Sequence, residues 1–436
     1  MTAGRTRPRE STRRGSGAGG CLYIGGRWMT QQTRRYLPTL FDTFFLGGFE
    51  CSTHRRHDDR RLDLIASTKH DRLVVEDYQQ LAKHDIRSVR DGIRWHLIET
   101  SPGCYDWSSF LPMLRAARDN GVQVMWDLCH YGWPDDLDIW KPEFVARFAR
   151  FAEAAARVVR DETDAIPFFC PVNEISYFAW AGGDVARFNP LGRRRGAELK
   201  NQLVRASIAA IEAVRGVEPR ARFIQPDPVI SVVSAPWGPT PEDRMEAENY
   251  RCAQYQSWDM LAGFLFPELG GKPEYLDIIG VNYYSDNQWM IGGRIADPDV
   301  SGSRPFQTVE LGHPLYRPFR ELLVDIYGRY GRPILISETG AESVAQPVWL
   351  RYVADEVRSA LACGIPVEGI CLYPIIHYPG WLDDRHCECG LFGVADDQGR
   401  RAVDEGIADT LRREQKFFAN LFQQEQRRER MSQDVK

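Results

Sequence analysis

Residues 166–174 read IPFFCPVNE, an apolar run of strand length that ends in the carboxyl group of Glu174. Residues 332–338, RPILISE, repeat the pattern and end in Glu338. Short apolar runs bounded by turn residues are typical of strands that are buried on both faces, as in a parallel sheet. The strand candidates of this kind are 41–48, 86–93, 122–129, 166–173, 221–227, 275–284, 332–338 and 367–375.

Amphipathic stretches separate these runs. Residues 143–162, 199–216 and 348–364 carry apolar side chains three to four positions apart, which predicts helices, and Gly216 and Gly364 are the expected C-caps of the last two. Alternating strands and helices imply a parallel sheet, and eight is the number of strands that closes a (β/α)8 barrel. We therefore predict a single-domain α/β protein, a (β/α)8 TIM barrel, with a doubly wound open sheet as the structural alternative.

The predicted barrel domain spans residues 37–425, because no linker or change of composition interrupts it. Residues 1–36 form a basic N-terminal segment rich in Arg, Gly and Ser, which we expect to be disordered. This segment has no apolar stretch of the kind that a secretory signal needs, and Met29 is an alternative start. Residues 426–436 are expected to be a charged C-terminal tail.

Bulk composition narrows the possible partners. The net charge is −5 with one basic run at the N-terminus, which does not favour a nucleic-acid partner, and no apolar run reaches the 18 or so residues of a membrane span. The ten cysteines are scattered, several inside apolar runs, as expected of buried free thiols in a reducing compartment such as the cytoplasm. Only residues 386–389, His-Cys-Glu-Cys, resemble a metal cluster, and they lack a second ligand pair at zinc spacing, so no metal is predicted. The oligomeric state stays open.

Glu174 and Glu338 end the fourth and seventh strand candidates, and in a (β/α)8 barrel the active site lies at the carboxyl ends of the strands. These two strands would face one another across the barrel mouth. In retaining glycoside hydrolysis one carboxyl protonates the leaving oxygen and a second, about 5–5.5 Å away, attacks the anomeric carbon. Either Glu alone reads as an ordinary polar residue at a strand end, whereas the pair favours catalysis.

The motifs around these residues resemble clan A glycoside hydrolases, most closely family 1, the β-glucosidase family. The resemblance covers roughly residues 41–400, and the matching pieces occur in the family's order. They are Asn173-Glu174, Ile336-Ser337-Glu338-Thr339-Gly340, Val89-Arg90 with Trp95, His130 before Pro134, Gly280-Val281-Asn282-Tyr283-Tyr284, and Gly390-Leu391-Phe392-Gly393-Val394.

The resemblance implies the catalytic roles. Glu174 would be the general acid and then the general base, with a pKa raised toward neutrality, and Glu338 would be the nucleophile, kept ionised. Arg90 would hold Glu338 charged through a charge-assisted hydrogen bond, and Tyr284 would donate to the same carboxylate. An interior salt bridge is the alternative for Arg90. Tyr283 is expected to pack, because adjacent strand residues face opposite ways.

The resemblance also implies sugar contacts. Asn173 would hold the sugar 2-hydroxyl and His130 another hydroxyl, with a hydrogen-bonded core histidine as the alternative for His130. Asn282 belongs to the same substrate-binding group. Trp381 is retained as a stacking platform, and Tyr373 stands where the family has the leading Trp of this segment.

Three departures from the family concern loop shape and sugar recognition. Ile175 stands where family 1 usually has Pro, Gly380 stands where it has the Glu that grips the distal hydroxyls, and its sugar-binding Gln has no clear counterpart in residues 50–56. A site that loses a hydroxyl partner loses its preference for that hydroxyl, so a plain glucoside is not expected to be the substrate. His54, with the two arginines that follow it, suits an acidic or otherwise modified sugar.

The sequence thus predicts a retaining β-glycosidase that acts on a small-molecule glycoside or oligosaccharide without a cofactor. The alternatives are another clan A glycosidase or a transglycosylase, and an inactive sugar-binding protein on the same fold. Residues 285–318 are long enough to form a lid over the site, in which Trp289 and Met290 would shape the aglycone subsite or simply cover the barrel.

Overall fold

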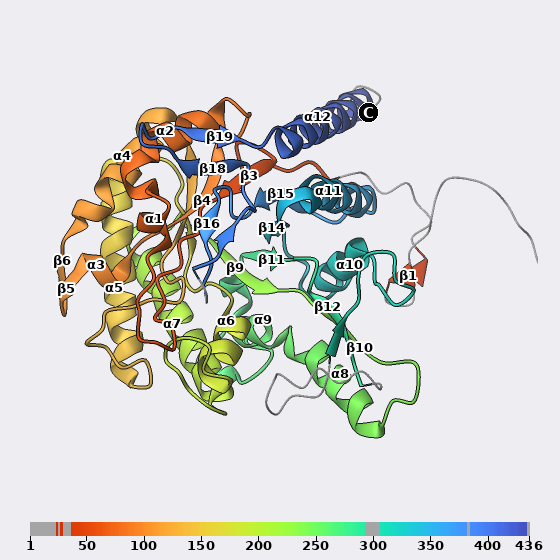
Figure 1. The fold of residues 1–436 in the computed structure, drawn as a ribbon, viewed down its shortest axis with the longest axis horizontal. Helices are drawn as coiled ribbons and strands as arrows, with labels where there is room; N and C mark the ends of the chain where they lie inside the picture. The colour runs from red at the N-terminus through yellow and green to blue at the C-terminus, as the bar shows by residue number, and fades with distance from the viewer. Residues whose placement is uncertain (1–22, 25–26, 29–35, 293–305, 382–383, 434–436) are drawn as a thin grey trace, which may run out of the picture.

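Eight parallel strands close into a barrel in the computed structural model, which describes residues 23–24, 27–28, 36–292, 306–381 and 384–433 (Figure 1). Each strand candidate overlaps one barrel strand, with β9 and β14 each ending one residue beyond its candidate, so the predicted (β/α)8 barrel is confirmed and the open-sheet alternative is excluded. In chain order the barrel strands are β3 (Phe45–Gly48), β4 (Ser88–Gly92), β7 (Gln123–Asp127), β8 (Phe168–Cys170), β9 (Arg222–Pro228), β11 (Ile278–Asn282), β14 (Ile334–Thr339) and β15 (Val367–Leu372).

The barrel is closed by the pairing of its first strand, β3, with its last, β15, where Phe45 lies opposite Ile370. A small apolar cluster fills the interior below the mouth, as expected of a barrel of this size. The cluster consists of Leu46, Met125, Phe168, Ile224, Ile278, Leu335, Cys371 and Tyr373. A larger apolar core lies between the strands and the surrounding helices.

The helices form a layer around the barrel (Figure 1). They are α1 (Leu64–Ser67), α2 (His70–Ala82), α3 (Trp95–Ile98), α4 (Leu111–Asn120), α5 (Pro142–Glu162), α6 (Ile175–Phe178), α7 (Gly196–Val217), α8 (Pro241–Ala253), α9 (Gln256–Leu261), α10 (Phe319–Tyr330), α11 (Gln346–Ala362) and α12 (Glu405–Gln433). The short helical turns are η1 (Trp107–Ser109), η2 (Ala179–Asp184), η3 (Pro267–Leu269), η4 (Pro273–Tyr275) and η5 (Ser343–Ala345).

The three helices predicted from periodicity are present as α5, α7 and α11. Gly364 lies directly after Cys363, which is the C-cap of α11, and has φ +78°, the left-handed conformation that glycine commonly adopts just beyond a helix. The prediction for Gly216 is wrong, because α7 continues through Val217 and Glu218 is its C-cap. The apolar spacing located the helix correctly but not its last turn.

The segment after β11 forms a small sheet rather than a simple lid. Here β12 (Gln288–Ile291) pairs with β10 (Ser231–Ser234) and with β13 (Phe306–Thr308). Trp289 packs edge-on against Tyr250 of α8, with ring centroids 5.6 Å apart, and Met290 is buried. Both residues therefore pack within the small sheet and its surroundings, Trp289 against α8 and Met290 against Ala235 and Val309, and residues 293–305 of the predicted lid lie outside the described residues.

Short antiparallel pairs complete the described structure. They are β1 (Tyr23–Ile24) with β2 (Arg27–Trp28), β5 (Glu99–Ser101) with β6 (Cys104–Tyr105), β16 (Tyr378–Pro379) with β17 (His386–Cys387), and β18 (Phe392–Ala395) with β19 (Arg401–Val403). The rest of the predicted N-terminal tail lies outside the described residues. At the other end, α12 runs to Gln433, so residues 426–433 of the predicted tail are helical.

Two further findings concern the cysteines and the possibility of a membrane-spanning helix. Every described cysteine is a free thiol. Within the described residues, no helix combines the length and the apolar character that crossing a bilayer requires.

Candidate active site

Glu174 lies at the mouth of the barrel, four residues after the end of β8. Its backbone is in the left-handed region, with φ 46° and ψ 61°, a conformation that is uncommon for a residue with a Cβ and that often marks functional sites. The turn is held by the Glu174 amide, which donates to the Pro226 carbonyl at 3.1 Å, and by the Ser176 amide, which donates to the Asp227 carboxylate. Ile175 begins α6 directly after this turn.

Glu338 lies on β14 and receives two hydrogen bonds. Arg90 of β4 donates from Nη1 to Oε1 at 2.6 Å, and the Tyr284 hydroxyl donates to Oε2 at 2.9 Å. Both contacts that the sequence predicted for this carboxylate are present. Tyr283 points the other way and stacks on Phe319 at 4.0 Å, so its predicted packing role is confirmed.

Arg90 is fully buried and joins three elements of the barrel. Besides Glu338, its guanidinium donates to both oxygens of Asp127, at 2.9 and 2.7 Å, and from Nη2 to the Asn173 side-chain oxygen at 2.6 Å. A guanidinium is the one side chain whose planar fork can hold three such partners at once. Arg90 is therefore both an interior salt bridge and a direct partner of Glu338.

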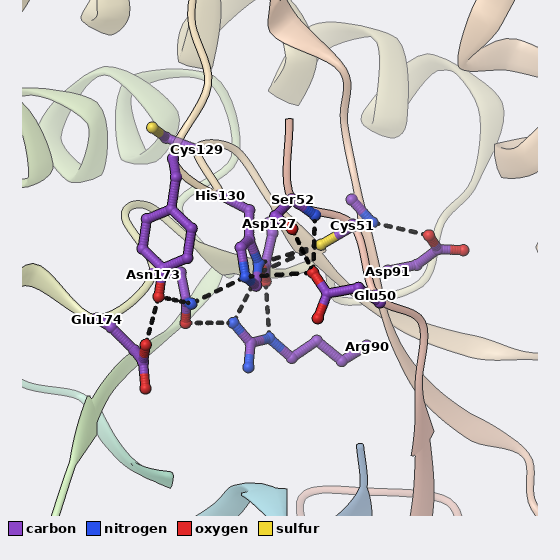
Figure 2. Close-up of polar contacts among 12 residues, drawn as sticks. Glu50, Cys51, Ser52, Arg90, Asp91, Asp127, Cys129, His130, Asn173 and Glu174 are labelled. Carbon is purple, nitrogen blue, oxygen red and sulfur yellow. Dashed lines mark hydrogen bonds and ion pairs between the residues drawn. The ribbon is translucent and has the colours of Figure 1, made fainter. Parts of the chain in front are cut away.

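The hydrogen bonds fix the tautomer of His130 (Figure 2). Because the Asn173 oxygen accepts from Arg90, its amide nitrogen is the donor, and it lies 3.0 Å from His130 Nε2. His130 Nε2 must then accept, which leaves the ring proton on Nδ1, 2.9 Å from Asp127. The network therefore makes Nε2 the acceptor from Asn173 and Nδ1 the donor to Asp127.

Glu174 is held by neutral donors. Asn282 of β11 donates to its Oε1 at 2.9 Å, and the Tyr131 hydroxyl donates to Oε2. The Asn282 oxygen accepts from Ser337, the residue before Glu338, at 2.6 Å. Asn282 and Ser337 thus connect the two carboxyl groups through a short chain of hydrogen bonds.

The pKa values of both carboxyls are raised. Burial raises the pKa of Glu174 to about 7, against the opposing effect of its donors Tyr131 and Asn282. Burial also raises the pKa of Glu338 to about 7, although Arg90 opposes it, and the nearby Glu174 adds to the rise. The expectation that only the pKa of Glu174 would rise is therefore not met. Of the two carboxyls, Arg90 donates only to Glu338, and this charged donor favours the ionised form of Glu338 over that of Glu174.

An aromatic group adjoins Glu174 through Tyr131. The Tyr131 ring lies 5.4 Å from Trp381 and 5.2 Å from Phe188, and His54 lies 5.2 Å from Trp381. His54 is fully buried, and neither of its ring nitrogens has a hydrogen-bond partner among the described residues. Burial lowers its pKa to about 3, with a partly opposing effect of the Trp381 backbone, so His54 is neutral. The Trp381 indole N–H also has no partner within the described part of the chain.

The arginines after His54 are already paired. Arg55 forms ion pairs with Asp135 and Asp59, and Arg56 with Asp58 and Asp384. With these guanidinium groups neutralised and His54 uncharged, the segment offers no free positive charge. This removes the physical basis for expecting an acidic sugar.

The third site element lies at the end of β3. Cys51 Sγ is 3.2 Å from His130 Nδ1 and 4.0 Å from the Tyr373 hydroxyl, and the Tyr373 ring is stacked with that of His130 at 6.3 Å. Cys51, Asp127 and His130 are the one group of potential metal ligands that comes together in the described residues. Their ligand atoms are hydrogen-bonded to one another, and the charge of Asp127 is neutralised by Arg90. This donor set therefore does not suit a metal ion.

The sequence did not single out Asp127, Tyr131 and Glu50 as site residues. Asp127 and Glu50 have the signal that revealed Glu174, a carboxylate at the end of an apolar strand. Tyr131 had no such signal, since its role depends on a contact made in space. Trp95, which was part of the family resemblance, lies away from the site in an aromatic cluster with Phe151.

The closed barrel with its pair of buried carboxyls gives this chain a glycosidase-like (β/α)8 fold. Among solved structures it is similar to the family 1 β-glucosidase from Thermotoga maritima, with a TM-score of 0.68, 15% identity, and 88% of this chain and 99% of the other covered. It is likewise similar to the AHE enzyme from Alicyclobacillus herbarius, with a TM-score of 0.68, 16% identity, and 87% and 99% covered. No family model and no curated protein matches the sequence. At these identities the likeness establishes a shared fold, that of family 1 β-glucosidases.

Proposed function

We propose that this protein is a retaining β-glycosidase that hydrolyses O-glycosidic bonds, with Glu174 as acid/base and Glu338 as nucleophile. The observation that carries the proposal is the different bonding of the two carboxyls. Glu338 has the only cationic donor that reaches either group within the described residues, whereas Glu174 is held by the amide of Asn282 and the hydroxyl of Tyr131. This asymmetry assigns the charge to one group and the proton to the other.

The reaction would proceed in two displacements. In the first, a Glu338 oxygen attacks the anomeric carbon while Glu174 gives its proton to the leaving glycosidic oxygen, which forms a glycosyl ester on Glu338. In the second, Glu174 takes a proton from water, and the resulting hydroxide oxygen displaces Glu338 from the anomeric carbon. The proton count and the charge of the pair are restored, and the configuration is retained.

The neighbouring residues would orient the sugar. Asn173 and His130 lie in the network between the two carboxyls and would meet hydroxyls on the reacting ring, as would Asn282 beside Glu174. Tyr373 would flank the ring from the end of β15. Trp381 and His54, with their unpaired N–H and ring nitrogens, would supply a stacking face and a neutral hydrogen bond.

Two variants test the mechanism. Glu338→Ala should abolish turnover, and added azide should partly restore it with a product of inverted configuration, because a small nucleophile can enter the vacated space. Glu174→Ala should lose far more activity on substrates with poor leaving groups than on activated aryl glycosides. Full activity of Glu338→Ala would overturn the nucleophile assignment.

Two measurements separate a hydrolase from the alternative functions: which acceptor receives the glycosyl group, and whether any glycoside is cleaved. Transfer to a second sugar in preference to water, measured by product analysis, would define a transglycosylase with the same chemistry. If the wild-type chain binds sugars but cleaves no glycoside of a broad panel, the result would favour a sugar-binding protein. The departure at Gly380 supports a substrate other than a plain glucoside.

A further inference from the structure

Glu50 is a third carboxylate at the catalytic pair, and the mechanism does not use it. It lies two residues beyond the end of β3 and is 5% exposed. Its Oε1 accepts from the Ser52 amide at 3.0 Å and from the Ser52 hydroxyl at 2.6 Å. Both donors therefore bind the same oxygen of Glu50.

The second oxygen of Glu50, Oε2, has no hydrogen-bond partner in the described part of the chain. Among the described residues, no donor lies within hydrogen-bond distance of Oε2, and no Arg or Lys pairs with Glu50 at all. The nearest ring nitrogen, His130 Nε2, is 4.0 Å from Oε1, which is too far for a hydrogen bond, and it already accepts from Asn173. In Figure 2, Glu50 reaches from the β3 side toward the Arg90 and His130 network.

The charges of the site do not balance. Among the described residues, Arg90 is the one guanidinium that bonds to this group of carboxylates: it donates to Asp127 and Glu338 and makes no contact with Glu50. The side chains at the reacting centre therefore carry an excess of negative charge. Glu50 is close enough for its charge to add to the rise in the pKa of Glu338, which is due mainly to burial.

Glu50 is largely buried, and among the described residues its Oε2 has no donor, so a ligand that donates to Oε2 would be favourable. A neutral sugar would satisfy the hydrogen bond but leave the charge. An acidic sugar would add to the excess, and the segment after His54 offers no free cation to receive it. A sugar that carries a protonated amine supplies both a donor and the missing positive charge.

We propose that Glu50 binds a protonated amino group of the substrate, so that this site selects β-glycosides of amino sugars with a free amine. This inference rests on the proposed function for the position of the sugar, but it concerns binding and does not depend on turnover. Hydrogen bonds between charged partners are about twice as strong as neutral ones, so a preference of about tenfold or more over the hydroxyl parent is expected.

The test measures binding to the full-length chain by isothermal titration calorimetry. The probes are methyl β-thioglycosides, which resist hydrolysis, of glucosamine, glucose and N-acetylglucosamine, with the matching galacto series. The amino sugar of one series should bind about tenfold more tightly than both its hydroxyl parent and its N-acetyl derivative, because only the free amine is charged. Equal binding within both series would overturn the proposal without any variant.

The second part of the test repeats the binding measurements on the variant Glu50→Gln. The amide keeps an oxygen for Ser52, so the turn after β3 should persist, and thermal unfolding checks this. The variant should lose the preference for the amino sugar, whereas Glu268→Gln, an exposed change of the same charge in the turn that precedes β11, should keep it. A preference that survives in Glu50→Gln would also overturn the proposal.

Failure of the two proposals is distinguishable. If the amino sugar binds preferentially but its nitrophenyl β-glycoside is not cleaved, the hydrolytic function fails and the role of Glu50 stands. If β-glycosides are cleaved but amino, hydroxyl and N-acetyl sugars bind alike, the function stands and the role of Glu50 fails.

Discussion

Tyr131 lies between the aromatic group around Trp381 and Glu174, the proposed catalytic acid. Its hydroxyl donates to Glu174 and accepts from the Asn173 amide at 2.9 Å. A donor to a carboxylate favours the ionised form, so Tyr131 restrains the rise in the pKa of Glu174 that burial causes. The pH dependence of hydrolysis should report this contact directly.

Tyr131→Phe should move the alkaline limb of the pH–rate profile upward. In the wild type, activity should fall as the pH rises through about 7, because Glu174 must be protonated to act as the acid. Removing the donor raises the pKa of Glu174 further, and a shift of about one pH unit is expected. The control is Tyr177→Phe, whose ring packs beside Tyr131 at 6.1 Å and forms no hydrogen bond with Glu174 in the described structure. A limb that stays in place or moves down would contradict the role of Tyr131.

Single residues also mark the limit of sequence-based prediction at the site. Glu174 and Glu338 were predictable because each ends an apolar strand, and barrel topology alone brings strand ends together. That signal applies equally to Glu50, Asp127 and Asp227. What separates these carboxyls is their partners: Asp127 is neutralised by Arg90, and Asp227 accepts from Ser257 and the Ser176 amide. Such pairings depend on contacts across the barrel, which no local pattern encodes.

At the scale of elements, the strands were more predictable than the helix ends. A barrel strand is buried on both faces, so its sequence is a continuous apolar run whatever surrounds it. The end of a helix depends on backbone angles that the following residues set. Gly364, predicted as a C-cap, lies one residue beyond the C-cap Cys363, whereas Gly216 is the last residue but one of α7.

Substitution by alanine should change the free energy of unfolding in opposite directions at Gly216 and Gly48. At Gly216 an added Cβ would meet nothing within 4 Å, and alanine is favoured over glycine inside a helix by about 1 kcal/mol, so Gly216→Ala should raise the free energy of unfolding. At Gly48 an added Cβ would lie 2.1 Å from a Tyr373 ring carbon, so Gly48→Ala should lower it by about 1–3 kcal/mol. Urea unfolding of both variants measures the difference. A stabilised Gly48→Ala would show that β3 and β15 are not packed as closely as described.

A buried ionic cluster connects α2 to β4. His70 contacts Asp77 through Nδ1 at 2.8 Å and Asp91 through Nε2 at 2.9 Å, and Arg401 of β19 binds Asp77. His70 also stacks on Phe49, the residue before Glu50, at 3.6 Å. Burial lowers the pKa of His70, but Asp91 and Asp77 outweigh it and raise the pKa to about 9.

The stability of the protein should therefore fall between neutral and alkaline pH. A histidine whose pKa is higher in the folded state stabilises fully below its unfolded pKa, about 6.5, and loses this effect as the pH rises through about 9. The stabilisation is of the order of 3 kcal/mol. Urea unfolding should show a gap between wild type and His70→Gln that is largest at pH 6 and narrows by pH 9.5. The exposed control His57→Gln should show no such gap, and a gap independent of pH would refute a charged His70.

At the scale of the whole molecule, barrel closure brings together the first and the last strand of the barrel. The first strand, β3, pairs with the last, β15, and the C-terminal helix α12 covers the outside of this junction (Figure 1). Phe418 of α12 stacks on Phe44 at 4.4 Å and meets Phe45 edge-on at 5.5 Å. A residue close to the C-terminus therefore supports the strand that leads to Glu50.

Two neighbouring phenylalanines of α12 test this connection. Phe418 is 1% exposed and Phe417 is 60% exposed. Phe418→Ala should lower the free energy of unfolding by about 3–5 kcal/mol, because it leaves a cavity against β3. Phe417→Ala should cost about 1 kcal/mol or less, since it loses only a surface contact with Arg358. The measurement is urea unfolding followed in parallel by tryptophan fluorescence and by residual hydrolysis. If closure makes the barrel one cooperative unit, the fluorescence and activity transitions of Phe418→Ala should shift together to a lower urea concentration. Loss of activity at a urea concentration well below the fluorescence change would mean that the junction of β3 and β15 opens separately from the rest of the barrel.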